Sequence, residues 1–237
     1  MGSAPVSSVV RPNGFNPVLF DLDGTVVDTV ELITASFRHA TRTVLGEVLP
    51  DEVITAGVGR PLLAQMQRLS PANADELLAV YREYNHRRHD ELIRRYAGVE
   101  EMLLALRAAG RRLGIVTSKG REATDMAFRA VGLADHFDVV ITASDTEEHK
   151  PSPVPLRLCL ERLGAAADDA VYVGDSPFDV QAGLAAGMTT IAVAWGLFDR
   201  ATLLASQPHF WVDSPEELLT LCLRGEGEAP LATTGAA

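Results

Sequence analysis

The stretch Val18-Leu-Phe-Asp-Leu-Asp-Gly-Thr-Val-Val-Asp28 is a short apolar run that stops at two carboxylates placed two residues apart. We interpret it as a buried strand that delivers Asp21 and Asp23 to the edge of a sheet, because side chains two residues apart on a strand point to the same side. Gly24 would let the chain turn away without the steric cost of a Cβ atom. Both acids can then face one reactant.

The two neighbouring carboxylates indicate either a metal site or acid/base chemistry, because each raises the pKa of the other unless a cation lies between them. An aspartate can also attack a phosphoryl group and form an acyl phosphate, while a second carboxyl group handles the proton of the leaving oxygen. A strand followed by an ordinary Asp-Gly turn would show the same local pattern. The residues downstream must therefore decide between these interpretations.

The composition is that of an ordinary globular protein: 237 residues, of which 47% are hydrophobic and 22% charged. The formal charge of −11 argues against non-specific binding to nucleic acid or to an anionic membrane. The uncharged run 182–198 is too short and too interrupted to span a bilayer. Cys159 and Cys222 form neither a Cys-x-x-Cys pair nor a disulfide framework, which fits a reducing cytoplasm. The oligomeric state stays open between monomer and dimer.

Two patterns of apolar residues follow the first strand. Between residues 30 and 95 they recur at three- and four-residue spacing, which predicts an all-helical insertion. Its first helix is expected to open with a capping box formed by Asp28 and Glu31. From residue 96 onward, short strands alternate with helices, which predicts an α/β fold with a doubly wound, Rossmann-like parallel sheet.

The sequence therefore predicts a core with an inserted domain and two flexible ends. The core is expected to comprise residues 16–29 and 96–224, and the inserted helical domain residues 30–95. A flexible arm at residues 1–15 and a flexible tail at residues 225–237 complete the division. A chain of this length suits one domain with a large insertion or two modest domains.

Polar residues that follow several different strands are expected to converge, because ligands of doubly wound sheets bind beyond the carboxyl ends of the strands. The collected residues are Asp21, Asp23, Thr117, Ser118, Lys150, Asp175 and Asp179. With a bound phosphate dianion, the four aspartates would bring the formal charge to about −6 against one lysine, so a hard divalent cation is needed. Mg²⁺ fits best, because it prefers oxygen ligands.

The residues expected at this edge have side chains that phosphoryl transfer requires. Asp21 and Asp175 would each offer Mg²⁺ a carboxylate oxygen. Hydroxyl and backbone N–H groups of Thr117 and Ser118 would hold the phosphoryl oxygens. Lys150 is expected to be catalytic and to bind the phosphate, offsetting charge between it and the nucleophile.

Four motifs resemble, in order and spacing, those of the haloacid dehalogenase superfamily. They are Asp21-Leu-Asp-Gly-Thr, the strand ending in Thr117-Ser, Lys150-Pro and Gly174-Asp-Ser-x-x-Asp179. The resemblance extends over residues 16 to 223, nearly the whole chain. The helical insertion looks like the family's C1 cap, which places the chain near phosphoglycolate phosphatases, inorganic pyrophosphatases and β-phosphoglucomutases.

The resemblance implies a role for each aspartate. Asp21 would be the nucleophile. Asp23 would be the general acid/base and would also give Mg²⁺ a backbone carbonyl. Asp175 would be a metal ligand, and Asp179 would lie beside the ligands rather than among them.

By the same resemblance, the cap closes over the cleft, excludes water and selects the substrate. The segment Gly57-Val-Gly-Arg-Pro61 matches the position of the family's substrate-specificity loop. Arg60 is the candidate for contact with the leaving portion of the substrate. A surface arginine at the start of a helix is an equally good interpretation.

The expected function is a Mg²⁺-dependent phosphatase that hydrolyses a small phosphorylated metabolite through an aspartyl-phosphate intermediate. The substrate is expected to be a sugar phosphate or a compound bearing one. A β-phosphoglucomutase-like transferase, a phosphoglycolate phosphatase or a pyrophosphatase would use the same motifs. Dehalogenation is disfavoured because the superfamily's dehalogenases lack an aspartate at the position of Asp23. A non-catalytic binding protein is disfavoured because no motif residue is missing.

Overall fold

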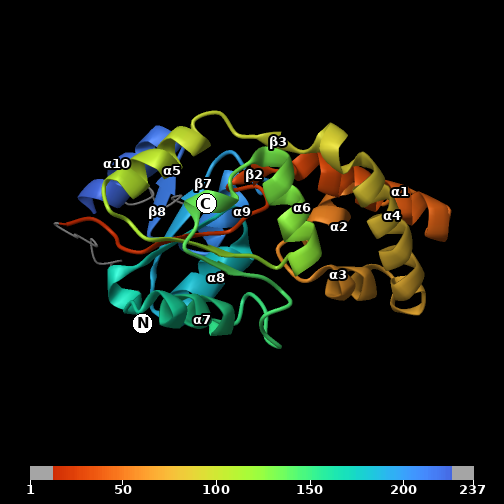
Figure 1. The fold of residues 1–237 in the computed structure, drawn as a ribbon. Helices are drawn as coiled ribbons and strands as arrows, with labels where there is room; N and C mark the ends of the chain where they lie inside the picture. Colours follow the sequence, from red (N-terminus) through yellow and green to blue (C-terminus); the bar gives the residue numbers. More distant parts are fainter. Residues whose placement is uncertain (1–12, 226–237) are drawn as a thin grey trace, which may run out of the picture.

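A six-stranded parallel sheet with helices on both faces forms the core of the computed structural model, which describes residues 13–225 (Figure 1). Residues 1–12 and 226–237, most of the expected arm and tail, lie outside the described residues. Phe15 also falls within the expected arm, but it is fully buried in the core. Its N–H donates to the carbonyl of Cys222 at 2.9 Å, so this part of the arm belongs to the core.

The sheet has the strand order β5-β4-β1-β6-β7-β8. Its strands are β1 (Val18–Phe20), β4 (Leu113–Val116), β5 (Val139–Ile141), β6 (Val171–Gly174), β7 (Thr189–Val193) and β8 (Phe210–Val212). From β1 the chain winds outward through β4 and β5, then returns to the other side of β1 and winds outward through β6, β7 and β8. The expected doubly wound, Rossmann-like α/β fold is confirmed.

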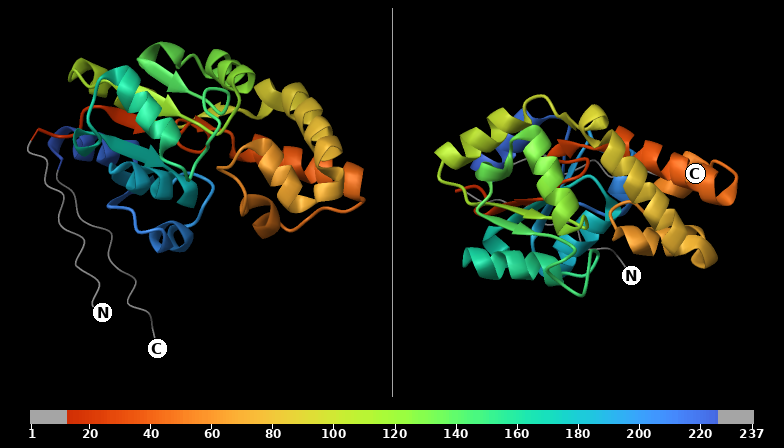
Figure 2. Two further views of the ribbon diagram at one scale, coloured as in Figure 1. Left: turned by 90° about the horizontal axis from the view of Figure 1, so that it is seen from below. Right: turned by 45° about the vertical axis from the view of Figure 1, so that its right-hand side comes forward.

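Side chains of β1 alternate between two hydrophobic layers, as the pleat of a strand requires. Val18 and Phe20 pack on one face against α5, α6 and α10, and Leu19 packs on the other against α7 and α8 (Figure 2). The core helices are α5 (Val99–Ala108), α6 (Arg121–Val131), α7 (Val154–Leu163), α8 (Pro177–Ala186), α9 (Arg200–Ala205) and α10 (Pro215–Arg224). The sequence analysis does not predict α9 or α10.

The insertion after the first strand forms a helical unit with its own apolar core. Its helices are α1 (Val30–Leu45), α2 (Asp51–Thr55), α3 (Leu62–Leu69) and α4 (Ala74–Leu92). Phe37, Met66 and Leu77 are fully buried among them, and Tyr81 packs edge-on against Phe37 with ring centroids 4.9 Å apart. The views in Figures 1 and 2 place α1 to α4 to one side of the sheet.

A two-stranded antiparallel ribbon connects the two ends of this unit. It pairs β2 (Val27–Asp28), on the way into the helices, with β3 (Arg94–Arg95), on the way out. The expectation of helix as far as residue 95 is therefore wrong at its last two residues. Pairing with β2 gives these residues backbone hydrogen bonds that a helix end would lack.

The capping box expected from Asp28 and Glu31 does not form. Asp28 lies in β2 and accepts a hydrogen bond from the N–H of Val30 at 3.2 Å, while the first helix begins after Thr29 without a side-chain cap. A capping box does form at the start of α8, between Ser176 and Asp179. The extended pairing of β2 with β3 therefore overrides the local helix signal at Asp28.

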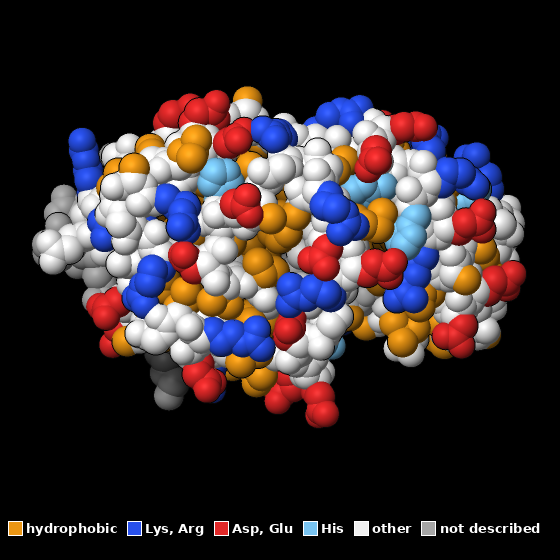
Figure 3. All heavy atoms as spheres, viewed as in Figure 1, with side chains coloured by type: hydrophobic (Ala, Val, Ile, Leu, Met, Phe, Trp, Pro, Cys, Tyr) orange, Lys and Arg blue, Asp and Glu red, His pale blue; other side chains and the backbone are white. Residues whose placement is uncertain are grey.

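Across residues 13–225, none of the helices has the length and apolar character that crossing a bilayer requires. On the face shown in Figure 3, acidic and basic side chains are interspersed. The excess of acidic residues therefore does not form a single acidic patch on this face.

Gly114 lies where the middle of the sheet is too crowded for a side chain. A Cβ there would approach Leu19 Cδ2 to 2.7 Å and Cys159 Sγ to 2.8 Å. We expect Gly114→Ala to lower the free energy of unfolding by about 1–3 kcal/mol, because overpacking forces neighbours out of their preferred rotamers. Gly120→Ala is the control, since its Cβ would meet nothing closer than Ser144 Oγ at 3.9 Å. Equal stabilities of the two variants in urea unfolding would contradict this packing argument.

Candidate active site

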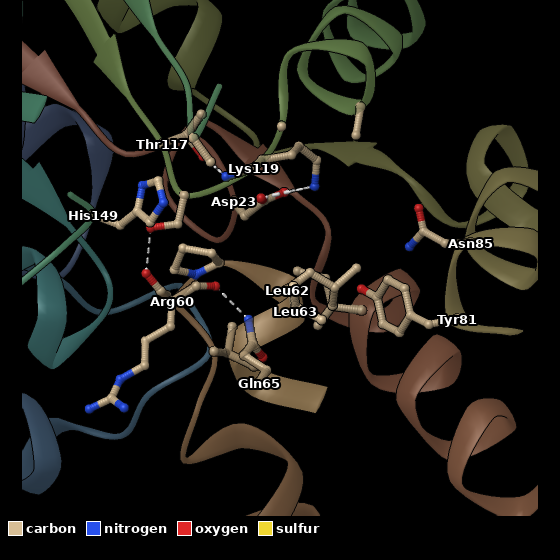
Figure 4. Close-up of a pocket in the computed structure, with 18 of the residues that line it drawn as sticks. Asp23, Arg60, Leu62, Leu63, Gln65, Tyr81, Asn85, Thr117, Lys119 and His149 are labelled. Atoms are coloured by element: carbon tan, nitrogen blue, oxygen red, sulfur yellow. Dashed lines mark hydrogen bonds and ion pairs between the residues drawn. The ribbon is translucent and has the colours of Figure 1, made fainter. Parts of the chain in front are cut away.

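The residues that follow the strands meet at the carboxyl edge of the sheet, beside a cavity of about 490 Å³ between the core and the helical insertion (Figure 4). Asp21 follows β1, Thr117 and Ser118 follow β4, and Asp175 follows β6. Both β4 and β6 are neighbours of β1, and the winding direction reverses between β1 and β6. Ligands of doubly wound sheets bind at such a switch point. Asp21, Asp23, Thr117, Ser118 and Asp175 all line the cavity.

Three buried carboxylates form the centre of the site. Asp21, Asp175 and Asp179 each offer an oxygen within 4.8 Å of the others. Both carboxylate oxygens of Asp179 already accept hydrogen bonds. One accepts from Lys150 Nζ at 2.6 Å and the other from the N–H of Ser176 at 3.0 Å. Asp21 and Asp175 are therefore better placed than Asp179 to bind a cation.

Lys150 lies behind the carboxylates rather than in the cavity. Its Nζ donates to Asp179, to the hydroxyl of Tyr172 at 3.0 Å and to the carbonyl of Val116 at 3.3 Å. It also lies 2.9 Å from Asp21 Oδ1, a charge contact outside hydrogen-bond geometry. Lys150 is 3% exposed and is not among the residues that line the cavity. Its ammonium therefore offsets charge at Asp21 and Asp179, and the phosphate contact expected of Lys150 stays a prediction.

Asp175 occupies a narrow space between two glycines. A Cβ on Gly24 or on Gly196 would come within 2.2 Å of its side chain, and Gly24 also has a φ of +77°. One Asp175 oxygen accepts from the N–H of Leu197 at 2.8 Å, and the other accepts from the hydroxyl of Thr25 at 3.4 Å. Close approach of backbone on both sides thus fixes the carboxylate.

The charge balance of the site fits a divalent cation. Burial, with the nearby Asp179 and Asp23, raises the pKa of Asp21 to about 7 although Lys150 opposes the shift. Burial, with Asp179 and Asp21, also raises the pKa of Asp175 well above its ordinary value. One lysine thus does not neutralise the cluster, and a hard cation with oxygen ligands would favour the ionised carboxylates.

Asp23 is paired with a residue that the sequence analysis does not single out. Lys119 Nζ lies 2.7 Å from Asp23 Oδ1 and 2.9 Å from Asp23 Oδ2, and both residues line the cavity (Figure 4). Lys119 directly follows the Thr117-Ser118 pair at the end of β4, and this adjacency is the signal that could have identified it. Of these two lysines, Lys119 lines the cavity and Lys150 does not.

The two hydroxyl residues after β4 have different surroundings. Thr117 Oγ1 accepts from the N–H of Lys119 at 3.1 Å, so its own proton remains free for another acceptor. Ser118 Oγ donates to the carbonyl of Gly59 at 2.6 Å and thereby joins the core to the helical insertion. In this arrangement the hydroxyl proton of Ser118 is not free for a phosphoryl oxygen.

Arg60 lies at the rim of the cavity with its side chain turned away from the carboxylates (Figure 4). Its guanidinium carbon lies 4.7 Å from the ring centroid of Phe178 on α8. Its backbone carbonyl accepts from Gln65 Nε2 at 2.6 Å. The Arg60 segment thus docks the insertion on the core, and the Arg60 side chain does not point at the reacting groups.

The insertion supplies a further wall of the cavity. Tyr81 packs in the core of the insertion and also lines the cavity, as do Gln65 and Asn85 (Figure 4). His149 lines it from the core. Only the packing of the insertion against the core brings Gln65, Tyr81 and Asn85 to the cavity, so no local motif marks them.

The fold and the site together define a class: hydrolases with a doubly wound sheet, an acidic cluster at its carboxyl edge and a helical insertion after the first strand. The profile of the haloacid dehalogenase-like hydrolase family matches residues 18–193. The chain belongs to the haloacid dehalogenase-like hydrolases.

Relatives and solved structures agree with this assignment. Pyrophosphatase PpaX of Bacillus velezensis is 40% identical over 202 residues, which cover 85% of this chain and 94% of that protein. A Lactobacillus plantarum structure, provisionally named a phosphoglycolate phosphatase, superposes with a TM-score of 0.78 at 26% identity, covering 88% of this chain and 99% of that one. A Thermotoga maritima structure, provisionally named a β-phosphoglucomutase, superposes with a TM-score of 0.70 at 26% identity. The match covers 87% of this chain and 97% of that one. The expected superfamily and the expectation of a phosphatase are confirmed.

Because the pKa of Asp21 is raised to about 7, a cation that binds it must displace a proton at neutral pH. We therefore expect the affinity for Mg²⁺ to increase with pH between about 6 and 8, with proton release on binding. Calorimetry in two buffers of different ionisation enthalpy measures both quantities. Asp175→Asn should bind Mg²⁺ more weakly and release fewer protons. Binding that is independent of pH would contradict this prediction.

Proposed function

We propose that the protein is a Mg²⁺-dependent phosphatase that hydrolyses a small phosphorylated metabolite, a sugar phosphate or a compound bearing one. The observation that carries the proposal is the buried carboxylate cluster at the switch point, open on one side to a cavity of about 490 Å³. The cluster provides a nucleophile and cation ligands, and the cavity has room for an organic leaving group.

In the proposed reaction Asp21 attacks the phosphorus atom. The bond between phosphorus and the ester oxygen breaks, and Asp23 gives its proton to that oxygen as the alcohol leaves. Asp23 then accepts a proton from water as the water attacks the phosphorus of the aspartyl phosphate. The second step releases inorganic phosphate and restores Asp21.

The proposed cation ligands are carboxylate oxygens of Asp21 and Asp175 and the backbone carbonyl of Asp23. When bound, Mg²⁺ would offset charge on the phosphoryl oxygens during attack. Asp179 is proposed to hold Lys150 in place, and Lys150 in turn to orient Asp21. This division follows from the full set of hydrogen bonds around Asp179.

The phosphoryl oxygens are proposed to bind backbone N–H groups after β4, the hydroxyl of Thr117 and the Lys119 ammonium. Lys119 would also hold Asp23 at the edge of the cavity between the two proton transfers. Lys150, named for this role from sequence, would act on the phosphate only through Asp21.

We further propose the division into a core, which comprises residues 16–29 and 96–224 together with Phe15, and a mobile cap of residues 30–95. Support comes from the separate apolar core of the helical unit and from the β2–β3 ribbon at its two ends. The proposed location is the cytoplasm, where the buried thiols of Cys159 and Cys222 would stay reduced. The proposed partner is the small phosphorylated substrate, and neither nucleic acid nor a membrane is proposed as a partner.

Pyrophosphate is the second candidate substrate. It is favoured by the relatives named pyrophosphatase, at 40% identity over most of both chains. A transfer of the phosphoryl group to a second sugar hydroxyl is a third possibility, raised by the Thermotoga maritima structure. Release of free phosphate separates hydrolysis from this transfer.

For Asp21→Asn we expect loss of at least about 10²-fold in phosphate release, because the amide is a poor nucleophile and a weaker ligand. The assay uses sugar phosphates, phosphoglycolate, pyrophosphate and an aryl phosphate, with and without Mg²⁺. Asp138→Asn is the control, since Asp138 pairs with Arg107 far from the cavity. Equal rates for the wild type and Asp21→Asn would refute the proposed function.

The Asp23→Asn variant tests the proton transfer separately. We expect a loss of about 10²–10⁴-fold in turnover, as for removal of a general acid/base, with affinity for Mg²⁺ largely kept, because only the backbone of Asp23 would bind the cation. Calorimetry gives the affinity and phosphate release gives the rate. Equal losses in both would assign Asp23 to holding the metal instead.

A further inference from the structure

The cap side of the cavity has an uncharged inner wall and a charged rim. Its buried lining residues are Ile33, Phe37, Gln65, Tyr81 and Asn85, and none of them carries a charge. The cap residues of the lining that carry or can gain a positive charge, Arg60, Arg82 and His86, are all exposed. A leaving group that binds beneath the cap therefore exchanges water for uncharged side chains of the cap.

The orientation of the Asn85 amide follows from two hydrogen bonds. Ser36 Oγ donates its single proton to the carbonyl of Leu32 at 2.6 Å. Ser36 can then only accept from Asn85, and Asn85 Nδ2 lies 3.1 Å away. The Asn85 amide nitrogen thus faces the interior of the cap, and its carbonyl oxygen faces the opposite way.

The Asn85 carbonyl oxygen has no hydrogen-bond partner among residues 13–225. It is not among the fully buried unpaired atoms, so it remains accessible from the cavity. The same is true of the hydroxyl of Tyr81, one helical turn earlier on α4. Figure 4 shows both side chains projecting from α4 toward Leu62, Leu63 and the Asp23–Lys119 pair. The inner wall thus offers a ligand one fixed acceptor and one hydroxyl.

These groups discriminate between kinds of leaving group. The leaving group of pyrophosphate is an anion whose oxygens accept hydrogen bonds, so it would face an acceptor oxygen and apolar side chains with no buried cation from the cap. A sugar or another polyol supplies hydroxyl donors for Asn85 and C–H surface for Ile33 and Phe37. Burial, with Asp23 nearby, raises the pKa of Tyr81, so its hydroxyl keeps its proton at neutral pH.

We propose that Asn85 and Tyr81 select the leaving group, and that this group is an uncharged polyhydroxy alcohol rather than an inorganic phosphate. Asn85 Oδ1 accepts from a hydroxyl of the leaving alcohol, and the Tyr81 hydroxyl donates to a second oxygen. Ser36 is the positioning residue that fixes the Asn85 amide. This inference rests on the proposed phosphatase function and assigns the specificity of the same site.

The test compares two substrates that differ in hydroxyl groups. Glucose 6-phosphate carries the hydroxyls, and n-hexyl phosphate has the same number of carbons without them. For Asn85→Leu we expect kcat/KM to fall about tenfold or more with glucose 6-phosphate and to stay level or increase with n-hexyl phosphate. Tyr81→Phe should change the ratio in the same direction by a smaller factor. Pyrophosphate should be a poorer substrate of the wild type than glucose 6-phosphate.

Control variants separate specificity from folding and from chemistry. Asn73→Leu makes the same substitution at the start of α4, outside the cavity lining, and should leave the ratio of the two kcat/KM values unchanged. Melting temperatures identify a variant whose cap has unfolded. Ser36→Ala should reproduce part of the Asn85→Leu effect, because it frees the amide to rotate.

The outcomes also distinguish this inference from the proposed function. Hydrolysis of aryl phosphate or pyrophosphate with no preference for glucose 6-phosphate over n-hexyl phosphate would overturn the inference and leave the phosphatase intact. Equal losses with both substrates in Asn85→Leu would overturn it as well. Absence of Mg²⁺-dependent hydrolysis of every probe by the wild type would overturn the proposed function and the inference together.

Discussion

The contact of Lys150 with two buried carboxylates is the interaction on which the rest of the site depends. Without the ammonium group, Asp21 and Asp179 would be buried like charges with no cation beside them, a state that costs several kcal/mol per ion. The Asp21 and Asp179 carboxylates outweigh the effect of burial and raise the pKa of Lys150, so the lysine stays charged. The cluster thus holds together before any metal binds, with one carboxylate turned to the cavity.

The fold concentrates charge at this point and covers it with the helical insertion. Parallel strands carry the aspartates to one edge, and the capping box of Ser176 and Asp179 fixes the turn after β6. The helical insertion covers that edge, and the hydrogen bond from Ser118 to Gly59 joins the two parts. A charged centre lies below a neutral wall, and this arrangement is the basis for the proposal that the core governs phosphoryl chemistry while the insertion governs the choice of leaving group.

Local sequence predicted secondary structure correctly wherever tertiary contacts favoured the same conformation as the segment itself. The alternation of short strands and helices expected after residue 96 is present in the structure, where the strands are β4 to β8. The capping box at Asp28 failed because pairing of β2 with β3 competes with helix formation there. The sequence places Lys150 at the carboxyl edge, but the burial of its side chain beside Asp21 and Asp179 could not be seen in the sequence, because it depends on packing.

By itself the sequence determined the doubly wound core, its helical insertion and the aspartates at the strand ends, because strand periodicity and the carboxyl-edge rule act over short stretches. Only the tertiary structure decided that Lys119 rather than Lys150 faces the cavity, that Arg60 rests on Phe178, and that the Asn85 oxygen is left free. These features depend on packing within the core, within the insertion and between the two. Such packing joins residues far apart in the chain, which no local pattern encodes.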